Sequence, residues 1–104
     1  ASCGMTYLLG GDVRKVCFAI KNIIANISGM ICDGAKPGCA LKVSTGVAAA
    51  VESALLAADG VEGPAHDGLI EKDIEKTIAN LGEHLPGSRQ DALPGPLALA
   101  FGCR

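Results

Sequence analysis

The sequence predicts an all-α fold of about three amphipathic helices, with an N-terminal apolar segment and an irregular Pro/Gly-rich tail. Of the 104 residues, 49% are hydrophobic but only three are aromatic, and the apolar content is mainly Ala, Leu, Ile and Val. Alanine loses no side-chain entropy in a helix and is the strongest helix former. Apolar residues also recur at helical spacing in three stretches that glycines separate. The length indicates one domain with a modest core.

The first predicted helix runs from Val13 to about Ser28. Gly10 and Gly11 end the apolar segment 1–9, and Asp12 is a suitable N-cap. The apolar positions of the helix recur three and four residues apart: Val13, Val16, Cys17, Ile20, Ile23, Ile24 and Ile27. Polar residues occupy the other face, which we expect to be solvated: Arg14, Lys15, Lys21 and Asn22.

The second predicted helix covers residues 39–58, with Pro37 in its first turn and Gly60 as its C-terminal cap. Its expected apolar stripe is Val47, Ala48, Val51, Ala54, Leu55 and Ala58. Gly46 and the many alanines make this helix thin, so neighbouring helices can approach it closely. We therefore expect it to be buried against a partner chain or a missing domain.

The third predicted helix runs from Ile70 to Leu81, with Gly82 just past its end. A loop with Pro64 and His66 precedes it. Residues 85–104 hold three prolines and no sustained period, which predicts an irregular tail.

Charge and targeting patterns narrow the possible partners. The net charge of −2 gives no strong field to attract nucleic acid or an anionic membrane. We expect no run long enough to cross a bilayer, and the N-terminus lacks a signal-peptide pattern. The sequence therefore predicts a cytoplasmic protein without a nucleic-acid or membrane partner.

The charges divide unevenly along the chain. Residues 12–42 carry five bases and two acids, whereas residues 52–83 carry eight acids and two bases. The favoured interpretation is two differently solvated helix faces. The alternative is a basic half that attracts an anionic ligand.

The stretch most suited to chemistry is the loop from Cys32 to Cys39, with the sequence Cys-Asp-Gly-Ala-Lys-Pro-Gly-Cys. Its glycines permit close approach of the backbone, and the helix start is expected to offer unpaired amides. With Lys36 and Lys42, these features favour thiolates at Cys32 and Cys39, or an anionic guest such as phosphate, carboxylate or an iron–sulfur cluster. The seven-residue spacing matches no common zinc pattern. Two buried structural cysteines remain an equal alternative.

The other candidate residues have simpler explanations. Five cysteines in a reducing compartment are ligands, catalytic groups or buried residues more often than disulfides. We interpret Cys17 as core, Cys3 as packing and Cys103 as incidental. His66 and His84 are possible further ligands, although a lone loop histidine is usually solvated.

The block Asn26-Ile27-Ser28-Gly29-Met30-Ile31-Cys32-Asp33-Gly34-Ala35-Lys36-Pro37-Gly38-Cys39-Ala40-Leu41-Lys42 is similar to a family signature. It resembles the C-terminal signature of the L-cysteine desulfidase family, which is related to the alpha chain of bacterial iron–sulfur L-serine dehydratases. The similarity extends back through residues 6–11 and forward to about Gly82. It implies that residues 1–84 are the helical C-terminal part of such an alpha domain, followed by the tail 85–104.

The resemblance also implies a chemistry. Members of the family are lyases that remove water or hydrogen sulfide from a small L-amino acid without pyridoxal phosphate. Three cysteines hold a [4Fe–4S] cluster whose open iron acts as a Lewis acid. By the match, Cys32 and Cys39 are two of these ligands, and the third lies upstream, outside this chain. No catalytic residue is assigned.

The implied assembly is a homo-oligomer or an association with a missing upstream domain, and the isolated chain is expected to be inactive. The alternative function is a non-catalytic helical packing or oligomerisation module with structural cysteines.

Overall fold

The computed structural model describes residues 1–30, 36–65 and 68–84. These ranges contain α-helices and no strand, which confirms the all-α class. The helices are α1 (Ser2–Leu8), α2 (Val13–Ile27), α3 (Cys39–Ala58) and α4 (Ile74–His84). The predicted tail 85–104 lies outside the described residues.

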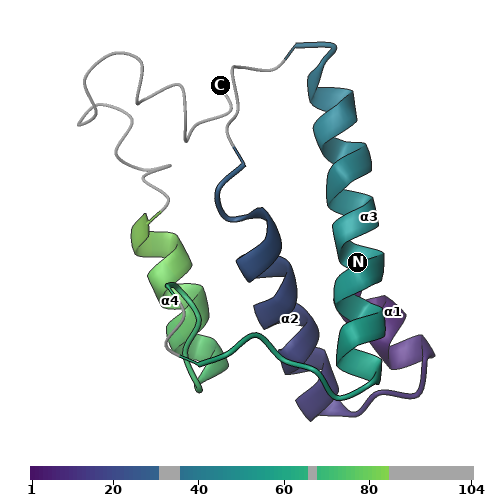
Figure 1. Ribbon diagram of the computed structural model, residues 1–104, viewed down its shortest axis with the longest axis vertical. Helices are drawn as coiled ribbons and strands as arrows, with labels where there is room; N and C mark the ends of the chain where they lie inside the picture. Colours follow the sequence, from purple (N-terminus) through teal and green to yellow (C-terminus); the bar gives the residue numbers. More distant parts are fainter. Residues whose placement is uncertain (31–35, 66–67, 85–104) are drawn as a thin grey trace.

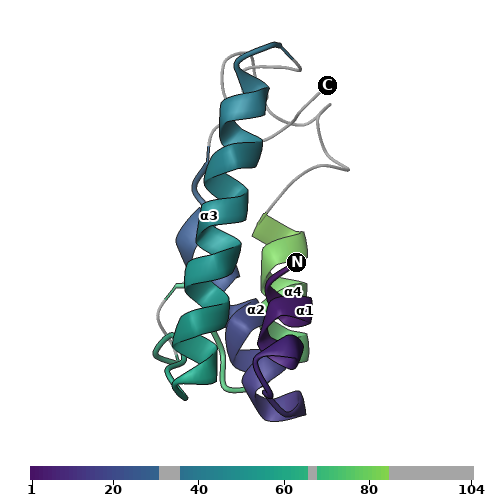
Figure 2. The same ribbon diagram turned by 90° about the vertical axis from the view of Figure 1, so that its right-hand side faces the viewer.

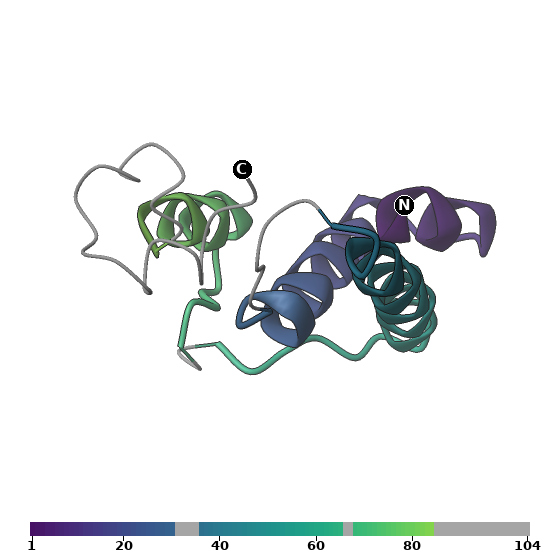
Figure 3. The same ribbon diagram turned by 90° about the horizontal axis from the view of Figure 1, so that it is seen from above.

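Helix α2 is the centre of the arrangement. It runs antiparallel to α3, with α4 on its other side (Figure 1). Helix α1 packs against both α2 and α3, beside the C-terminal half of α3 (Figures 1 and 2). Seen from above, α4, α2 and α3 follow one another across the molecule (Figure 3). Phe18 and Ala19 of α2 form the core cluster with Ala57 of α3.

The boundaries of α2 agree with the prediction. The Asp12 carboxylate accepts a hydrogen bond from the Lys15 backbone amide at 2.9 Å, so Asp12 is the N-cap. The predicted apolar face is only partly correct. Ile24 is buried, but Val13 at the first turn is exposed, and the other buried apolar residues are Phe18 and Ala19, which lie outside the predicted face.

Helix α1 is a correction, because the sequence indicated only an apolar segment there. It ends in a Schellman motif: the amide of Gly11 donates to the Thr6 carbonyl at 2.9 Å and that of Gly10 to the Tyr7 carbonyl at 3.0 Å. Gly10 has a φ of +84°, which favours glycine. A Cβ on Gly11 would lie 2.8 Å from the Thr6 carbonyl oxygen, so the chain must carry glycine there.

The same motif ends α3, as predicted from Gly60. Gly60 has a φ of +82°, and its amide donates to the Ala57 carbonyl at 3.0 Å. The amide of Val61 donates to the Leu56 carbonyl at 2.8 Å. The Lys15 ammonium adds a bond to the Ala58 carbonyl at 2.7 Å, so a cation of α2 caps the negative end of α3.

Helix α4 begins four residues later than predicted, at Ile74, and Gly82 lies inside it. The Asp73 carboxylate accepts a hydrogen bond from the Glu75 amide at 3.0 Å, which caps the helix and fixes its start. Ile70 is nevertheless buried, because residues before the cap fold back along α4. The hydroxyl of Thr77 accepts a bond from the Glu71 amide at 3.0 Å.

The predicted apolar stripe of α3 is wrong for most of its members. The residues that α3 buries are small: Ala49, Ala50, Ser53, Ala54 and Ala57. The larger residues Val47, Val51 and Leu55 are 52%, 41% and 52% exposed. The small side chains let the backbones of α1 and α2 come close, so periodicity in large residues identified the opposite side of the helix.

Helix α3 also contradicts the expectation that no run is long enough to cross a bilayer. Its 20 residues have a mean hydropathy of 1.4, so the helix is long and apolar enough to cross a membrane by length and composition alone. A core helix of a folded domain can be as long and as apolar.

Candidate functional site

Cys39 is the first residue of α3 and stands at the projecting end of the molecule. The first turns of α3 extend past the C-terminal end of α2 (Figures 1 and 2). Cys39 itself is half-buried, whereas the neighbouring Ala40, Leu41 and Val43 are exposed. Cys32 and the loop 31–35 lie outside the described residues, so the predicted pairing of Cys32 with Cys39 stays a prediction.

A heptad-spaced line of residues connects Cys39 with the core. Positions three and four residues apart lie on one face of a helix. In α3 this line consists of Cys39, Val43, Gly46, Ala50, Ser53 and Ala57. Its last three members are buried against the other helices. Cys39 therefore lies on the face that packs on the neighbours, about 27 Å along the axis from Ala57.

The helix start differs from the expectation of unpaired amides. The amide of Cys39 donates to the Lys36 carbonyl at 2.8 Å, and that of Ala40 donates to the Pro37 carbonyl at 3.1 Å. The amide of Leu41 donates to the Gly38 carbonyl at 3.1 Å. Pro37 thus lies in a lead-in turn before the helix. These amides already have partners, which weakens the anion-binding alternative.

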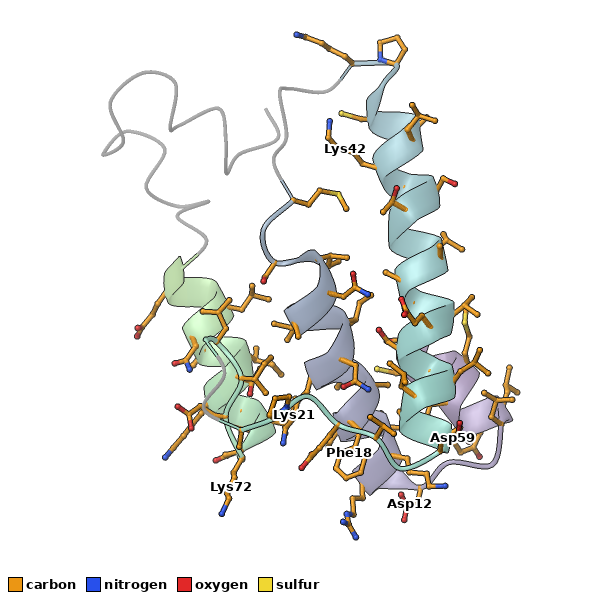
Figure 4. All side chains as sticks on the ribbon, viewed as in Figure 1. Asp12, Phe18, Lys21, Lys42, Asp59 and Lys72 are labelled. Atoms are coloured by element: carbon orange, nitrogen blue, oxygen red, sulfur yellow. The ribbon has the colours of Figure 1, made fainter. Side chains whose placement is uncertain are left out.

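Two lysines stand within one turn of Cys39 along the chain. Lys36 precedes it by three residues and is exposed, and Lys42 follows it by three residues and is half-buried. Figure 4 places the Lys42 side chain at the projecting end of α3, on the side toward α2. The two lysines therefore bracket Cys39 along the chain, and the stabilisation of a Cys39 thiolate by their charge stays a prediction.

The described residues supply no third ligand beside Cys39. No three His, Cys, Asp or Glu side chains converge within residues 1–30, 36–65 and 68–84. Cys3 lies on α1 and Cys17 on α2, and both are half-buried free thiols. Helix α1 packs beside the C-terminal half of α3, at the opposite end of that helix from Cys39. Cys103, His66 and the side chain of His84 lie outside the described residues.

The polar face of α2, expected to be solvated, instead binds the segment between α3 and α4. Lys21 is only 4% exposed. Its ammonium donates to the Lys72 carbonyl at 2.7 Å and forms an ion pair with the Glu62 carboxylate at 3.3 Å. Figure 4 shows Lys21 pointing from α2 toward this segment. The basic face of α2 therefore pairs partly with the acidic half of the chain.

Asn22 fixes the same segment through its side-chain amide. Its Nδ2 donates to the Val61 carbonyl at 2.9 Å, and its Oδ1 accepts from the Gly63 amide at 2.8 Å. One turn later, Asn26 donates to the Glu52 carboxylate of α3 at 3.2 Å. Sequence reasoning missed these residues because their partners lie 26 to 41 positions away along the chain.

Two hollows along α2 are lined by described residues, and Cys39 lines neither of them. A groove of about 250 Å³ at the C-terminal end of α2 is walled by Ile23, Ile24, Ile27, Ser28, Met30 and Leu81. These walls offer no charge to an amino acid's carboxylate or ammonium. A hollow with charged walls, including Arg14, Lys21 and Glu62, lies toward the other end of α2.

Comparisons with known proteins give this geometry a context. The serine dehydratase alpha chain family matches residues 1–95. A UPF0597 protein of Clostridium perfringens is 53% identical over 81 residues, which are 78% of this chain and 19% of that protein. UPF0597 proteins of Parabacteroides distasonis and Porphyromonas gingivalis are 54% and 49% identical over the same shares. No solved structure matches the chain.

The chain thus spans about a fifth of the length of the curated relatives that it matches. The family match includes all four helices together with Cys32 and Cys39. The chain belongs to the serine dehydratase alpha chain family.

Proposed function

We propose that this chain is the cluster-binding part of an iron–sulfur lyase that removes water or hydrogen sulfide from L-serine or L-cysteine. The observation that carries the proposal is the position of Cys39 at the projecting end of α3, within a chain that the family matches over residues 1–95. The membership supports a related lyase. The cluster, the substrate and the two ligands are the proposed refinements.

The donor set near Cys39 fits an iron–sulfur cluster in kind. Thiolates are the ligands of such clusters, and nearby cations stabilise thiolates. Cys39 lies between Lys36 and Lys42 in sequence, and Cys32 precedes it by seven residues. Cys32 and Cys39 would hold the cluster, with one further thiolate from outside this chain. When bound, the cluster supplies a Lewis-acidic iron to the departing hydroxyl or thiol.

The chain itself would position Cys39 for this role. The lead-in turn from Lys36 to Gly38 fixes the first amides of α3 and hence the direction of the Cys39 side chain. The packing of Ala50, Ser53 and Ala57 against α1 and α2 holds the rest of the helix. A rigid helix that carries a ligand on its first residue holds that ligand in a fixed position.

The alternative, a non-catalytic packing or oligomerisation module, is favoured by one observation. The large apolar residues of α3 are exposed rather than buried in this chain. This face suits contact with another protein segment, and such a contact is compatible with a cluster site at the cysteine loop. Cytoplasmic localisation, where thiols stay reduced, belongs to the proposal, as does the absence of nucleic-acid and membrane partners.

The experiment that tests the proposed function uses a chimaera. In it, this chain replaces the matching 81 residues of the Clostridium perfringens relative. After anaerobic reconstitution with iron and sulfide, the chimaera should release hydrogen sulfide from L-cysteine or ammonia from L-serine. Cys32→Ser and Cys39→Ser should abolish this activity, whereas Cys17→Ser on α2 should retain it. Full activity in Cys39→Ser would refute the proposed ligand role.

A further inference from the structure

Helix α3 has a second apolar face that nothing in the described part of the chain covers. This outer face consists of Val47, Val51 and Leu55, each about half exposed. These residues recur every four positions, so they form a continuous strip along the helix. Near the start of the helix, Leu41 adds a further exposed apolar side chain.

The strip is too regular to be scattered surface hydrophobicity. A surface helix normally keeps one apolar stripe and one polar face, whereas a helix that is apolar nearly all round belongs to the interior of a larger structure. In α3 the inner face buries Ala50, Ser53 and Ala57, and the outer face adds larger residues. The helix is therefore built to be enclosed on both sides.

The length of the relatives identifies the occupant. The matched 81 residues make up 19% of the Clostridium perfringens protein, so about four-fifths of its length lies outside the match. A segment covalently joined to α3 reaches its surface at a far higher effective concentration than a second molecule does. A membrane is a poorer occupant, because Glu52 lies in the middle of α3 and is bonded to Asn26.

We infer that the outer face of α3, at Val47, Val51 and Leu55, is covered by an apolar helix from the part of the longer protein that this chain lacks. This inference depends on the relatives' length and the exposed strip. It does not depend on the cluster or on the lyase chemistry.

Thermal unfolding of two proteins tests this inference. In the isolated 104-residue chain, the double substitution Val47→Asp with Val51→Asp should leave the melting temperature within about 2 °C of wild type, because exposed positions tolerate polar residues. In the chimaera with the Clostridium perfringens relative, the same pair should lower the melting temperature by about 5 °C or more, because a carboxylate is then buried without a partner.

The control is Val13→Asp, which changes another exposed valine, at the start of α2, where an acid suits the helix dipole. It should change the melting temperature of neither the isolated chain nor the chimaera.

An equal melting temperature for the double variant and the parent chimaera would overturn the inference. An isolated chain that forms dimers by light scattering, and becomes monomeric with the double substitution, would instead assign the face to a second copy. An unsubstituted chimaera that fails to fold would also contradict it.

Discussion

At the scale of single residues, the contact between Thr6 and Gly11 shows how one missing side chain permits a turn. The Thr6 hydroxyl donates to the Ser2 carbonyl at 2.8 Å, and its side chain is fully buried. The Gly11 backbone closes over it, where a Cβ would lie 2.7 Å from Thr6 Cγ2 and 2.8 Å from the Thr6 carbonyl oxygen. The second of these atoms belongs to the backbone and cannot turn aside.

Gly11→Ala should therefore lower the free energy of unfolding by about 2 kcal/mol or more, since the end of α1 must shift. Gly4→Ala is the matched control. Gly4 lies inside α1 with nothing within 4 Å of an added Cβ, so alanine there should stabilise the chain by about 0.5–1 kcal/mol. Urea unfolding followed by circular dichroism measures both changes. A loss of stability in Gly4→Ala together with no loss in Gly11→Ala would contradict the geometry.

Residue-scale signals explain what the sequence could predict of the site. Cys39 was placed at a helix start because Pro37 and Gly38 precede it, and the structure begins α3 at that residue. The amides behind it were expected to be unpaired. They are not, because the carbonyls of Lys36 to Gly38 turn back onto them. The N-cap is Gly38, which has no side-chain acceptor, so the local sequence gives no signal for this turn.

At the scale of elements, polar side chains of α2 bind the segment after α3. Lys15 caps the end of α3, and Lys21 and Asn22 bind backbone groups of residues 61–72. Arg14 lies over the Phe18 ring at 5.3 Å, which adds a cation–π contact on the same helix. The face that the sequence suggested was solvated is thus a binding face for the chain's own backbone.

Asn22→Ala should destabilise the chain by about 1 kcal/mol, because it removes two hydrogen bonds to the Val61 carbonyl and the Gly63 amide, of which the second is part-buried. Asn26→Ala removes one exposed bond to Glu52 and should cost less than about 0.5 kcal/mol. Chemical denaturation of the two variants gives the comparison. A cost at Asn26 that equals or exceeds the cost at Asn22 would show that the segment is held elsewhere.

The element boundaries show where sequence patterns succeed. Asp12 and Gly60 marked the start of α2 and the end of α3, because capping and positive φ have local chemical signatures. Helix α1 was missed because seven residues carry too little periodicity. The start of α4 was misplaced because Ile70 fits the helical period, although it is buried in the segment before the Asp73 cap.

At the scale of the whole molecule, the described helices bury one face of α3 and leave large apolar side chains exposed on another. The core cluster joins Phe18 and Ala19 to Ala57, and the strip at Val47, Val51 and Leu55 is about half exposed in the described part of the chain. Periodicity detected that strip as an apolar stripe but could not tell which side faces the chain's own helices. Small residues decide this, because alanine and serine permit the closest backbone approach and carry little signal in hydropathy.

The whole-molecule account joins the two ends of α3. The C-terminal half packs on α1 and α2, and the N-terminal half carries Cys39 outward on the same face. In the complete protein we expect this half to be enclosed together with the loop that contains Cys32. The domain boundary predicted at residue 84, before the tail 85–104, stays a prediction.

The most direct test of the central claim is the iron retained by the chimaera after anaerobic reconstitution and desalting, together with its visible absorption spectrum. We predict a brown protein with a broad sulfur-to-iron band that is kept in Cys17→Ser and lost in both Cys32→Ser and Cys39→Ser. If Cys39→Ser retains as much iron as the parent and the same spectrum, Cys39 is not a cluster ligand and the account is wrong.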